Sequence, residues 1–411
     1  MPRFIADFHI HSKYSRATSQ NMDIPNITRW ARIKGIDLMG TGDFTHPGWI
    51  QELKQNLRPS GNGLFTHEGI SYILSAEVCT IFFKGSKTRK VHNIILAPSF
   101  EEVEKINAKL SEYGNISSDG RPIFSFSARD LVAMILEVSE NSVVIPAHIW
   151  TPWFSLFGSQ SGFDSISDCF GDMREYIWAL ETGLSSDPAM NWRLSKLDRY
   201  SLISNSDSHS PQKIGREANI LNCDLDYYSI IQTLKSKDKN SFLMTVEFFP
   251  QEGKYHYDGH RKCNVVLAPK ETKMSRNICP ICGRKVTVGV MHRVEDLADR
   301  EEGFVPQNSI PFKHLIPLNE IIADVIATGT GSKTCEKQYN SLIKGLGTEF
   351  DILLNAPMEE LTRYSSTSIA QAILAVREGN VKLSPGYDGV YGKIETIKKG
   401  IAEDSPQLSL F

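Results

Sequence analysis

Histidine and carboxylate side chains recur at the ends of short apolar runs in the first half of the chain. His9 and His11 flank Ile10, and Asp207 and His209 flank Ser208. Residues i and i+2 of a β-strand point to the same face, so each pair presents two ligands to one ion. Other acidic and imidazole side chains border further apolar runs: Asp43, Glu77, His92, His148 and Glu181.

This mixture of side chains predicts a metal site. Imidazoles and carboxylates suit two or three ions such as Zn²⁺ or Mn²⁺. Such ions lower the pKa of water towards about 7 and hold phosphate and leaving oxygens, which is the chemistry of phosphoester hydrolysis. A lone strand-end histidine is more often structural, but five of the eleven histidines lie at predicted strand ends. That recurrence favours the metal site.

An alternation of strands and helices must position these residues. Residues 1–250 alternate short apolar runs with amphipathic segments, which predicts an α/β sheet or barrel. Asp23 before Pro25, and Ser127 followed by Asp130, are helix start signals. Most of the candidate ligands, including Glu77, are expected at the carboxyl ends of strands, where barrels assemble their chemistry. His92 is expected at the start of its strand.

A second group of metal ligands follows in residues 251–303. His260 and Cys263 form one pair with two residues between them, and Cys279 and Cys282 form another, with Gly283 next. This spacing predicts a structural zinc site with four protein ligands. His292 is an alternative to His260 as the fourth ligand, and buried free cysteines are the alternative to a metal site.

The charge of the chain is uneven. The net charge is −3, which excludes a uniformly basic nucleic-acid-binding protein, yet residues 260–293 hold eight basic side chains against one acidic one. A second basic run spans residues 84–90. Basic runs are usually solvated loops, but a local charge this high favours contacts to the phosphates of DNA.

An aromatic segment follows His148. Trp150, Trp153 and Phe154 lie within residues 149–158. They form either a loop that covers the core or a wall on which an unpaired base stacks. The residue types leave both interpretations open.

The remainder of the chain is expected to be helical over residues 304–395, with a polar tail at 396–411. The tail ends in Gln407, Leu408, Ser409, Leu410 and Phe411, which is similar to the peptides that bind the bacterial sliding clamp. Folding of these residues onto the helical domain is the alternative to docking in a partner's apolar cleft.

Length and composition support a folded protein of several domains. The chain has 411 residues, 41% of them hydrophobic, which predicts two or three domains. No apolar run reaches 18 residues, so we expect no membrane span. Seven cysteines at low density favour a reducing compartment, and we expect a cytoplasmic, nucleoid-associated protein.

The motifs resemble the polymerase-and-histidinol-phosphatase superfamily. The matching segments are HIH at 9–11, Asp43, Glu77, His92, His148 and DSH at 207–209. The resemblance implies a distorted β/α barrel with a trinuclear metal centre. It implies that the following residues hold the ions: His9, His11, Asp43, Glu77, His92, His148, Asp207 and His209. The histidine that usually follows the second-motif aspartate is missing, and His46 either replaces it or contacts substrate.

The layout of barrel, zinc module and helical domain resembles the endonuclease Q family from residue 3 to about 395. This resemblance implies a metal-dependent DNA repair nuclease that cuts 5′ to a deaminated base (uracil, hypoxanthine or xanthine) or an abasic site, leaving a 3′-hydroxyl and a 5′-phosphate. The expected catalytic residues are His9, His11, Asp207 and His209. The expected substrate contacts are Lys13, Tyr14, Arg16, His46, Trp150, Trp153 and Phe154.

The expected cofactors are structural Zn²⁺ and catalytic Zn²⁺, Mg²⁺ or Mn²⁺, and the expected partners are damaged DNA and the sliding clamp. The alternative function is hydrolysis of a small phosphorylated metabolite by the same centre.

Overall fold

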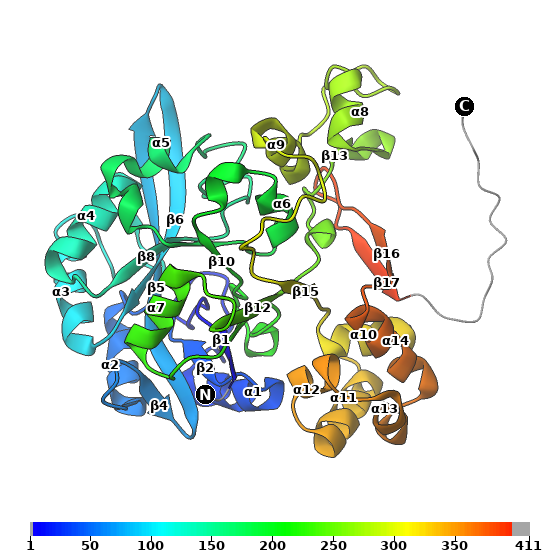
Figure 1. Cartoon of the computed structure of the whole chain (residues 1–411), viewed down its shortest axis with the longest axis horizontal. Helices are drawn as coiled ribbons and strands as arrows, with labels where there is room; N and C mark the ends of the chain where they lie inside the picture. Colours follow the sequence, from blue (N-terminus) through cyan, green and yellow to red (C-terminus); the bar gives the residue numbers. More distant parts are fainter. Residues whose placement is uncertain (1–2, 397–411) are drawn as a thin grey trace. The chain divides into compact units, whose positions relative to one another are not determined.

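The structure of the protein, a computed structural model, describes residues 3–396 (Figure 1). The chain divides into two compact units. The first comprises residues up to 315 and a returning segment, 384–393, and the second comprises residues 316–383 and the segment that begins at 394. The sequence-predicted clamp peptide, residues 407–411, lies outside the described residues.

The first unit is a mixed α/β fold. Its main strands are β1 (Phe4–Asp7), β2 (Leu38–Gly40), β3 (Arg58–Pro59), β4 (Phe65–His67), β5 (Ile70–Lys84), β6 (Lys87–Ala97), β7 (Ile123–Phe124), β8 (Val143–Pro146), β9 (Ala179–Glu181), β10 (Ser201–Ile203), β11 (Ala218–Leu221), β12 (Phe242–Glu247) and β15 (Phe312–His314). Its main helices are α1 (Ile24–Lys34), α2 (Pro47–Asn56), α3 (Phe100–Ser111), α4 (Ala128–Val138), α5 (Ile166–Phe170), α6 (Pro188–Trp192) and α7 (Tyr227–Ser236).

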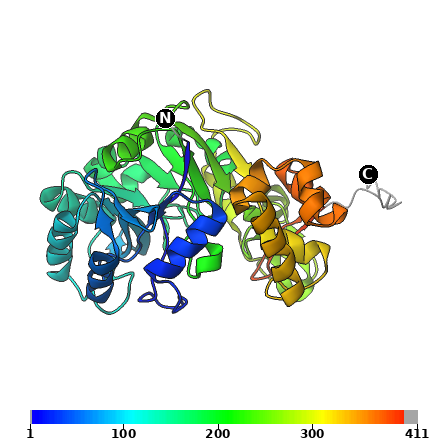
Figure 2. The same cartoon turned by 90° about the horizontal axis from the view of Figure 1, so that it is seen from below.

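The central strands β1, β2 and β5 are parallel neighbours, and the sheet continues from β5 through β6 to β8 by antiparallel pairing. Strands β9 and β10 form a separate parallel pair. Helices α2 to α4 lie on the outer side of the sheet (Figures 1 and 2). The interior is filled by apolar side chains from many strands, among them Phe8, Ile73, Ile94 and Ile145.

Side-chain amides connect β10 to the main sheet. Asn219 on β11 accepts a hydrogen bond from the Ser204 amide at 3.0 Å and donates to the Ser204 carbonyl at 2.8 Å. Asn205 accepts from the Phe8 amide at 2.9 Å, which fixes the end of β1 beside the end of β10. These side-chain hydrogen bonds join the β9–β10 pair to the main sheet at this point, and the expected α/β class is confirmed.

The helix start signals are confirmed. Asp23 caps α1 by accepting from the Asn26 amide, and Gly35 ends this helix with φ 83°. Ser127 caps α4 by accepting from the Asp130 amide.

Strands β5 and β6 are longer than the sequence indicated. They pair from Leu74 and Ala97 to Lys84 and Lys87, so Glu77 and His92 lie in the middle of their strands. The prediction that Glu77 ends a strand and that His92 begins one was therefore wrong. Both faces of β5 are buried around Glu77, and a strand of this kind has no sequence period that marks its length.

A small module within the first unit carries the cysteines. It contains β13 (Asp258–His260), a 3₁₀ turn (Arg261–Cys263), β14 (Val265–Leu267), α8 (Pro269–Met274) and α9 (Val290–Leu297). Val265, Cys279 and Val286 form its own small core. This core is too small to stabilise a fold alone, so a metal staple is expected.

The second unit is mainly helical. Its helices are α10 (Leu318–Val325), α11 (Lys333–Leu346), α12 (Glu349–Leu354), α13 (Met358–Tyr364) and α14 (Thr367–Arg377), followed by β16 (Val381–Ser384) and β17 (Lys393–Thr396). Helix α14 buries Ile369, Ile373 and Val376, as its periodicity predicts. None of the helices in the described residues is long and apolar enough to cross a bilayer.

Candidate active site

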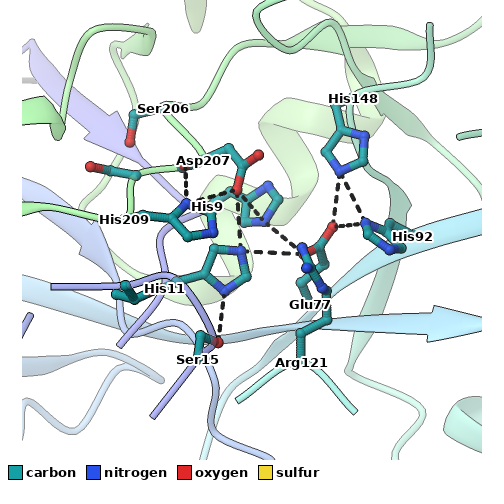
Figure 3. Close-up of polar contacts among 12 residues, drawn as sticks. His9, His11, Ser15, Glu77, His92, Arg121, His148, Ser206, Asp207 and His209 are labelled. Atoms are coloured by element: carbon teal, nitrogen blue, oxygen red, sulfur yellow. Dashed lines mark hydrogen bonds and ion pairs between the residues drawn. The ribbon is translucent and has the colours of Figure 1, made fainter. Parts of the chain in front are cut away.

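Four of the sequence-predicted ligands meet at one point. Potential ligand atoms of His9, His11, Glu77 and Asp207 lie within 4.8 Å of one another (Figure 3). His11 Nε2 is 3.1 Å from Asp207 Oδ1 and 3.3 Å from Glu77 Oε2. These residues come from the end of β1, the middle of β5 and the loop after β10, so the fold gathers segments that are distant in sequence.

A second group shares Glu77 with the first. Oε1 of Glu77 lies 2.7 Å from His92 Nδ1 and 3.0 Å from His148 Nε2. Glu77 thus points one carboxylate oxygen at each group (Figure 3). Glu77 would therefore contribute to both groups if each held a metal ion.

The unused ligand atoms of these side chains fit a cation. His9 Nε2, His11 Nε2 and Asp207 Oδ1 are buried and make no hydrogen bond of good geometry, although the two nitrogens lie 3.7 and 3.1 Å from Asp207 Oδ1. Buried polar atoms are rarely left without partners unless an ion or a functional demand accounts for them. Three such atoms directed at one point supply the nitrogen and oxygen ligands of a divalent metal.

The charges of the site favour the same conclusion. Burial alone would lower the pKa values of His9 and His11, but the surrounding carboxylates raise both well above the ordinary value. Burial would raise the pKa of Asp207, but His11 and His9 lower it. The carboxylates therefore attract positive charge to this position.

Asp43 lies behind His11 and does not face the other ligands. Its Oδ1 is 3.0 Å from His11 Nδ1, and its Oδ2 accepts hydrogen bonds from Ser12 and Ser15. Both oxygens are engaged, so the geometry makes Asp43 an orienting carboxylate instead of the ligand that the sequence indicated. Gly120 covers this carboxylate so closely that a Cβ there would lie 2.4 Å from Asp43 Oδ2.

Glu181 plays the same part behind His9. Its carboxylate lies 3.0 Å from His9 Nδ1 and accepts hydrogen bonds from the His148 amide at 2.7 Å and the Asn205 side chain at 2.9 Å. Second carboxylates of this kind fix the ring orientation and increase the basicity of a ligating histidine. The sequence marked Glu181 as a strand-end residue without assigning this role.

Strained backbone accompanies the site. Asp43, His148 and Asp207 have φ values of 48°, 30° and 46°, in the left-handed region that non-glycine residues seldom adopt. Such conformations persist where the surrounding structure imposes them and are concentrated at functional sites. Here they lie in the loops that follow β2, β8 and β10.

His209 and His46 lie at the rim. The His209 ring is 4.4 Å from the His11 ring, and its Nδ1 is 3.0 Å from the Asp207 carbonyl oxygen. It does not belong to either ligand group. His46 caps α2 by accepting from the Gly48 amide and stacks on Tyr14 at 4.3 Å. His46 therefore does not replace the missing imidazole.

Lys13, Tyr14 and Arg16, the predicted phosphate contacts, come shortly after His11 in the chain. Lys13 and Tyr14 both contact Glu52, at 2.9 and 2.7 Å. Arg16 pairs with Asp119 and leaves 81% of its side chain exposed. β1 ends at Asp7, so these groups, like His9 and His11, lie in the segment that follows it.

The aromatic segment after His148 is divided between core and surface. Trp150 is buried, donates to Asn191 at 2.8 Å and packs on Phe157. Its predicted contact with substrate is therefore wrong, because no face of the indole is free. Phe154 lies 4.9 Å from the His92 ring, and Trp153 is 46% exposed.

Arg121 is a site residue that the sequence did not indicate. Its Nη1 donates to Glu77 Oε2 at 2.9 Å, and 31% of its side chain is exposed. The charge of Glu77 raises the pKa of Arg121, so the guanidinium stays charged. Arg121 lies in a loop without periodicity, and no spacing connects it to Glu77.

The cysteine module brings its four predicted ligands together. Ligand atoms of His260, Cys263, Cys279 and Cys282 lie within 4.8 Å of one another. His292 instead lies 2.6 Å from Asp258, whose other oxygen accepts from the Gly289 amide. The geometry thus selects His260 over His292 as the fourth candidate ligand.

Comparisons with known proteins agree with this arrangement. A family described as the MJ0043 C-terminal domain matches residues 317–380. The chain is 33% identical over 271 residues to the uncharacterized protein MJ0043 of Methanocaldococcus jannaschii, a match that spans 63% of this chain and 33% of that protein.

Two solved structures match nearly the whole chain. One is the lesion-specific endonuclease PfuEndoQ from Pyrococcus furiosus, with a TM-score of 0.87, 31% identity and all of both chains covered. The other is endonuclease Q in complex with a 27-mer duplex that has an abasic lesion at the active site, with a TM-score of 0.85, 32% identity, and 98% of this chain and 100% of that one covered. The likeness includes both units and the cysteine module, and the chain belongs to the endonuclease Q family.

Proposed function

We propose that the protein is a metal-dependent endonuclease that hydrolyses DNA on the 5′ side of a deaminated base or an abasic site and leaves a 3′-hydroxyl and a 5′-phosphate. The observation that carries the proposal is the convergence of His9 Nε2, His11 Nε2 and Asp207 Oδ1, which are buried and make no hydrogen bond of good geometry, beside Glu77. The family likeness to lesion-directed nucleases supports DNA as the substrate.

The proposed metal ligands are His9, His11, Glu77, His92, His148 and Asp207. Bound divalent ions supply a water molecule of lowered pKa and neutralise charge on the phosphate and leaving oxygen. Imidazole nitrogens among the ligands favour Zn²⁺ or Mn²⁺ over Mg²⁺. The second site, at His260 and the three cysteines, is proposed to hold structural Zn²⁺, because thiolates select zinc and four protein ligands leave no open position.

The residues of the chain position and stabilise the reacting groups. Glu181 and Asp43 hold the His9 and His11 rings. Arg121, charged and partly exposed beside Glu77, is placed to donate to a phosphate oxygen. His209 covers His11 at the rim and is proposed to contact the scissile phosphate or its leaving oxygen.

Recognition of the lesion requires the damaged nucleotide to leave the duplex stack. Phe154 lies against His92, with the Lys90 ammonium 5.0 Å from its ring centroid. The ring centroids of Trp153 and Tyr255, which lies just before the cysteine module, are 5.9 Å apart. We assign these aromatic faces to stacking with bases near the lesion, with Lys13, Tyr14, Arg16 and His46 as candidate backbone or base contacts.

Residues 407–411 are proposed to bind the bacterial sliding clamp, on the strength of the sequence alone. The proposal places the nuclease on replicating DNA and so on the nucleoid.

The test is cleavage of an end-labelled duplex with a single uracil in the presence of Mn²⁺, Mg²⁺ or Zn²⁺. The expected product ends with a 3′-hydroxyl immediately 5′ to the uridine nucleotide, and Asp207→Asn abolishes it. Asp172→Asn, at an exposed carboxylate, is the matched control. Turnover of p-nitrophenyl phosphate with no cleavage of the uracil duplex would instead identify a small-molecule phosphoesterase.

A further inference from the structure

A basic tip ends the β5–β6 hairpin. The two strands pair without interruption to Lys84 and Lys87, and Gly85 and Ser86, both with φ of 60°, form the turn. This is the two-residue turn that matches the twist of a hairpin. Residues 84–90 contain four basic side chains and no acidic one. Figure 1 shows β5 and β6 running together out of the sheet to this point.

Phe83 stands exposed beside these charges. Its exposed fraction is 75%, and its neighbours from Lys84 to Thr88 are exposed as well. A single exposed apolar side chain is ordinary on a protein surface. Phe83 requires an explanation because it lies in a continuously paired hairpin that also carries two candidate metal ligands.

The exposed face of the tip is continuous with the face that lines the metal centre. Side chains alternate along a strand, so Glu77, Cys79, Ile81 and Phe83 share one face of β5. Directly opposite residues of an antiparallel pair lie on the same face, which adds His92, Lys90 and Thr88, the partners of Cys79, Ile81 and Phe83. One face of the hairpin therefore carries Glu77 and His92, which are buried, at one end and Phe83, which is exposed, at the other.

The opposite face anchors the ribbon. Phe82 stacks on Phe163 at 6.0 Å, and the Arg89 guanidinium lies 4.4 Å from the centroid of the same ring. Lys84 donates to the Asp168 carbonyl oxygen at 2.7 Å. These contacts prevent the tip from rotating to bury Phe83, so the aromatic ring is held outward.

We propose that Phe83 and Thr88, flanked at the turn by Lys87 of the opposite face, form a second contact to duplex DNA, remote from the lesion, in which Phe83 wedges against a base step in the minor groove. This inference rests on the proposed function. Duplex DNA is the partner because the charged side chains of the tip are all basic, and because the same face of the hairpin carries Glu77 and His92 of the proposed phosphodiesterase centre. Apolar wedges flanked by Lys or Arg are a common way to grip the minor groove.

The length of the ribbon sets the position of this contact. Six residues separate Glu77 from Phe83, which is about 20 Å along an extended strand. At about 3.4 Å per base pair, this corresponds to about six base pairs from the scissile phosphate. We therefore expect the tip to contact one arm of the duplex only when that arm extends at least about six base pairs from the scissile phosphate.

The experiment measures kcat/KM on uracil duplexes in which one arm is shortened in steps from about 14 to about 3 base pairs, for each arm in turn. For the wild-type protein we expect a fall of about fivefold or more when one of the arms becomes shorter than about six base pairs. The Phe83→Ala variant is expected to show no such fall on short arms, whereas Phe83→Trp is expected to retain it. Lys87→Ala is expected to reduce the salt dependence on long arms by about one phosphate contact. Lys105→Ala, an exposed lysine on α3, is the matched control.

A second readout tests the wedge itself. 2-Aminopurine placed about six base pairs from the uracil is expected to fluoresce more when the Asp207→Asn protein binds, and not when Phe83→Ala is added. If Phe83→Ala still shows the loss of kcat/KM on short arms and the fluorescence change, the inference is overturned. Cleavage of long uracil duplexes by this variant would still support the proposed function. Absence of uracil-dependent cleavage by the wild type would refute the proposed function instead.

Discussion

Asp43 Oδ1 lies 3.0 Å from His11 Nδ1, while His11 Nε2, on the other side of the ring, lies 3.1 Å from Asp207. The imidazole is held between an orienting carboxylate and a ligand carboxylate. This arrangement fixes which nitrogen faces the metal centre, since Nδ1 is engaged by Asp43.

Asp43→Asn is therefore expected to weaken the metal centre without emptying it. The amide has one oxygen in place of two, so it cannot satisfy His11, Ser12 and Ser15 together. We expect metal affinity or kcat to fall by about 10- to 100-fold, as for other changes behind a ligating histidine. Metal titration followed through cleavage rate checks this, with Asp172→Asn as control. Complete loss of bound metal would identify Asp43 as a ligand after all.

Arg121→Ala is expected to reduce binding of the scissile phosphate. Its guanidinium is charged and partly exposed beside Glu77, and no other arginine is paired with that carboxylate among the described residues. We expect kcat/KM for DNA to fall by about 100-fold. We also expect the slope of log kcat/KM against log salt concentration to decrease by the equivalent of about one phosphate contact.

Arg121→Lys should recover part of this activity, because it restores the charge without the paired donors. Arg129→Ala removes an exposed arginine that pairs with Asp172 and serves as the control. An unchanged KM and salt dependence, with lower metal content, would show that Arg121 acts only through Glu77.

Local patterns in the sequence predicted part of this site. The cap signals placed α1 and α4, and the His9 and His11 pair indicated a shared group of ligands, although β1 ends at Asp7 and both histidines lie beyond the strand in which they were expected. The spacing of the cysteines predicted their cluster. Each of these rests on residues a few positions apart, where strand, helix or turn geometry fixes the relative placement.

Other features depend on contacts that no local pattern records. Arg121 meets Glu77 across 44 positions, and Glu181 meets His9 across 172. Asp43 has the right residue type for a ligand, but whether its carboxylate faces the ion or the back of His11 is decided by Ser12, Ser15 and Gly120. Trp150 was indistinguishable from its exposed neighbour Trp153, because burial of a loop residue depends on the segment that covers it.

His260→Ala is expected to lose one zinc ion of the cysteine module, about one equivalent per chain, and to lower the Tm. His292→Gln is the informative comparison, because it retains a donor for the buried Asp258 carboxylate. Zinc content by elemental analysis should be unchanged in His292→Gln. The reverse pattern would make His292 the fourth ligand.

Deletion of residues 407–411 is expected to abolish binding to the sliding clamp and to leave nicking of short uracil duplexes intact. A short apolar peptide docks as a separate unit in a partner's cleft, so the active site does not depend on it. Surface plasmon resonance with immobilised clamp measures the first effect, and gel-based cleavage the second. The double variant Leu410→Ala, Phe411→Ala is expected to reproduce the deletion. Equal loss of both activities would show that these residues stabilise the fold.

The buried carboxyl groups of Glu217 and Glu247 are expected to make stability depend on pH. Burial raises the pKa of Glu247 from 4.5 to about 8, and burial together with the charge of Glu247 raises the pKa of Glu217 well above its ordinary value. Asp187 raises the pKa of Glu247 further, Arg216 partly offsets the shift in Glu217, and hydroxyl groups of Thr182 and Thr245 donate to Glu247.

A raised pKa means that the folded state keeps a proton that the unfolded chain releases. The stabilisation is therefore complete below about pH 4.5, where both states are protonated, and is lost as the pH rises through about 8. Glu247→Gln keeps a neutral group of the same size, so the Tm of this variant should fall less between pH 6 and 9 than the wild-type Tm, by about 5 °C or more. Thermal melts across this range test the prediction, with Glu137→Gln, at an exposed carboxylate, as control. Parallel pH profiles for Glu247→Gln and the wild type would show that Glu247 is already ionised in the folded protein.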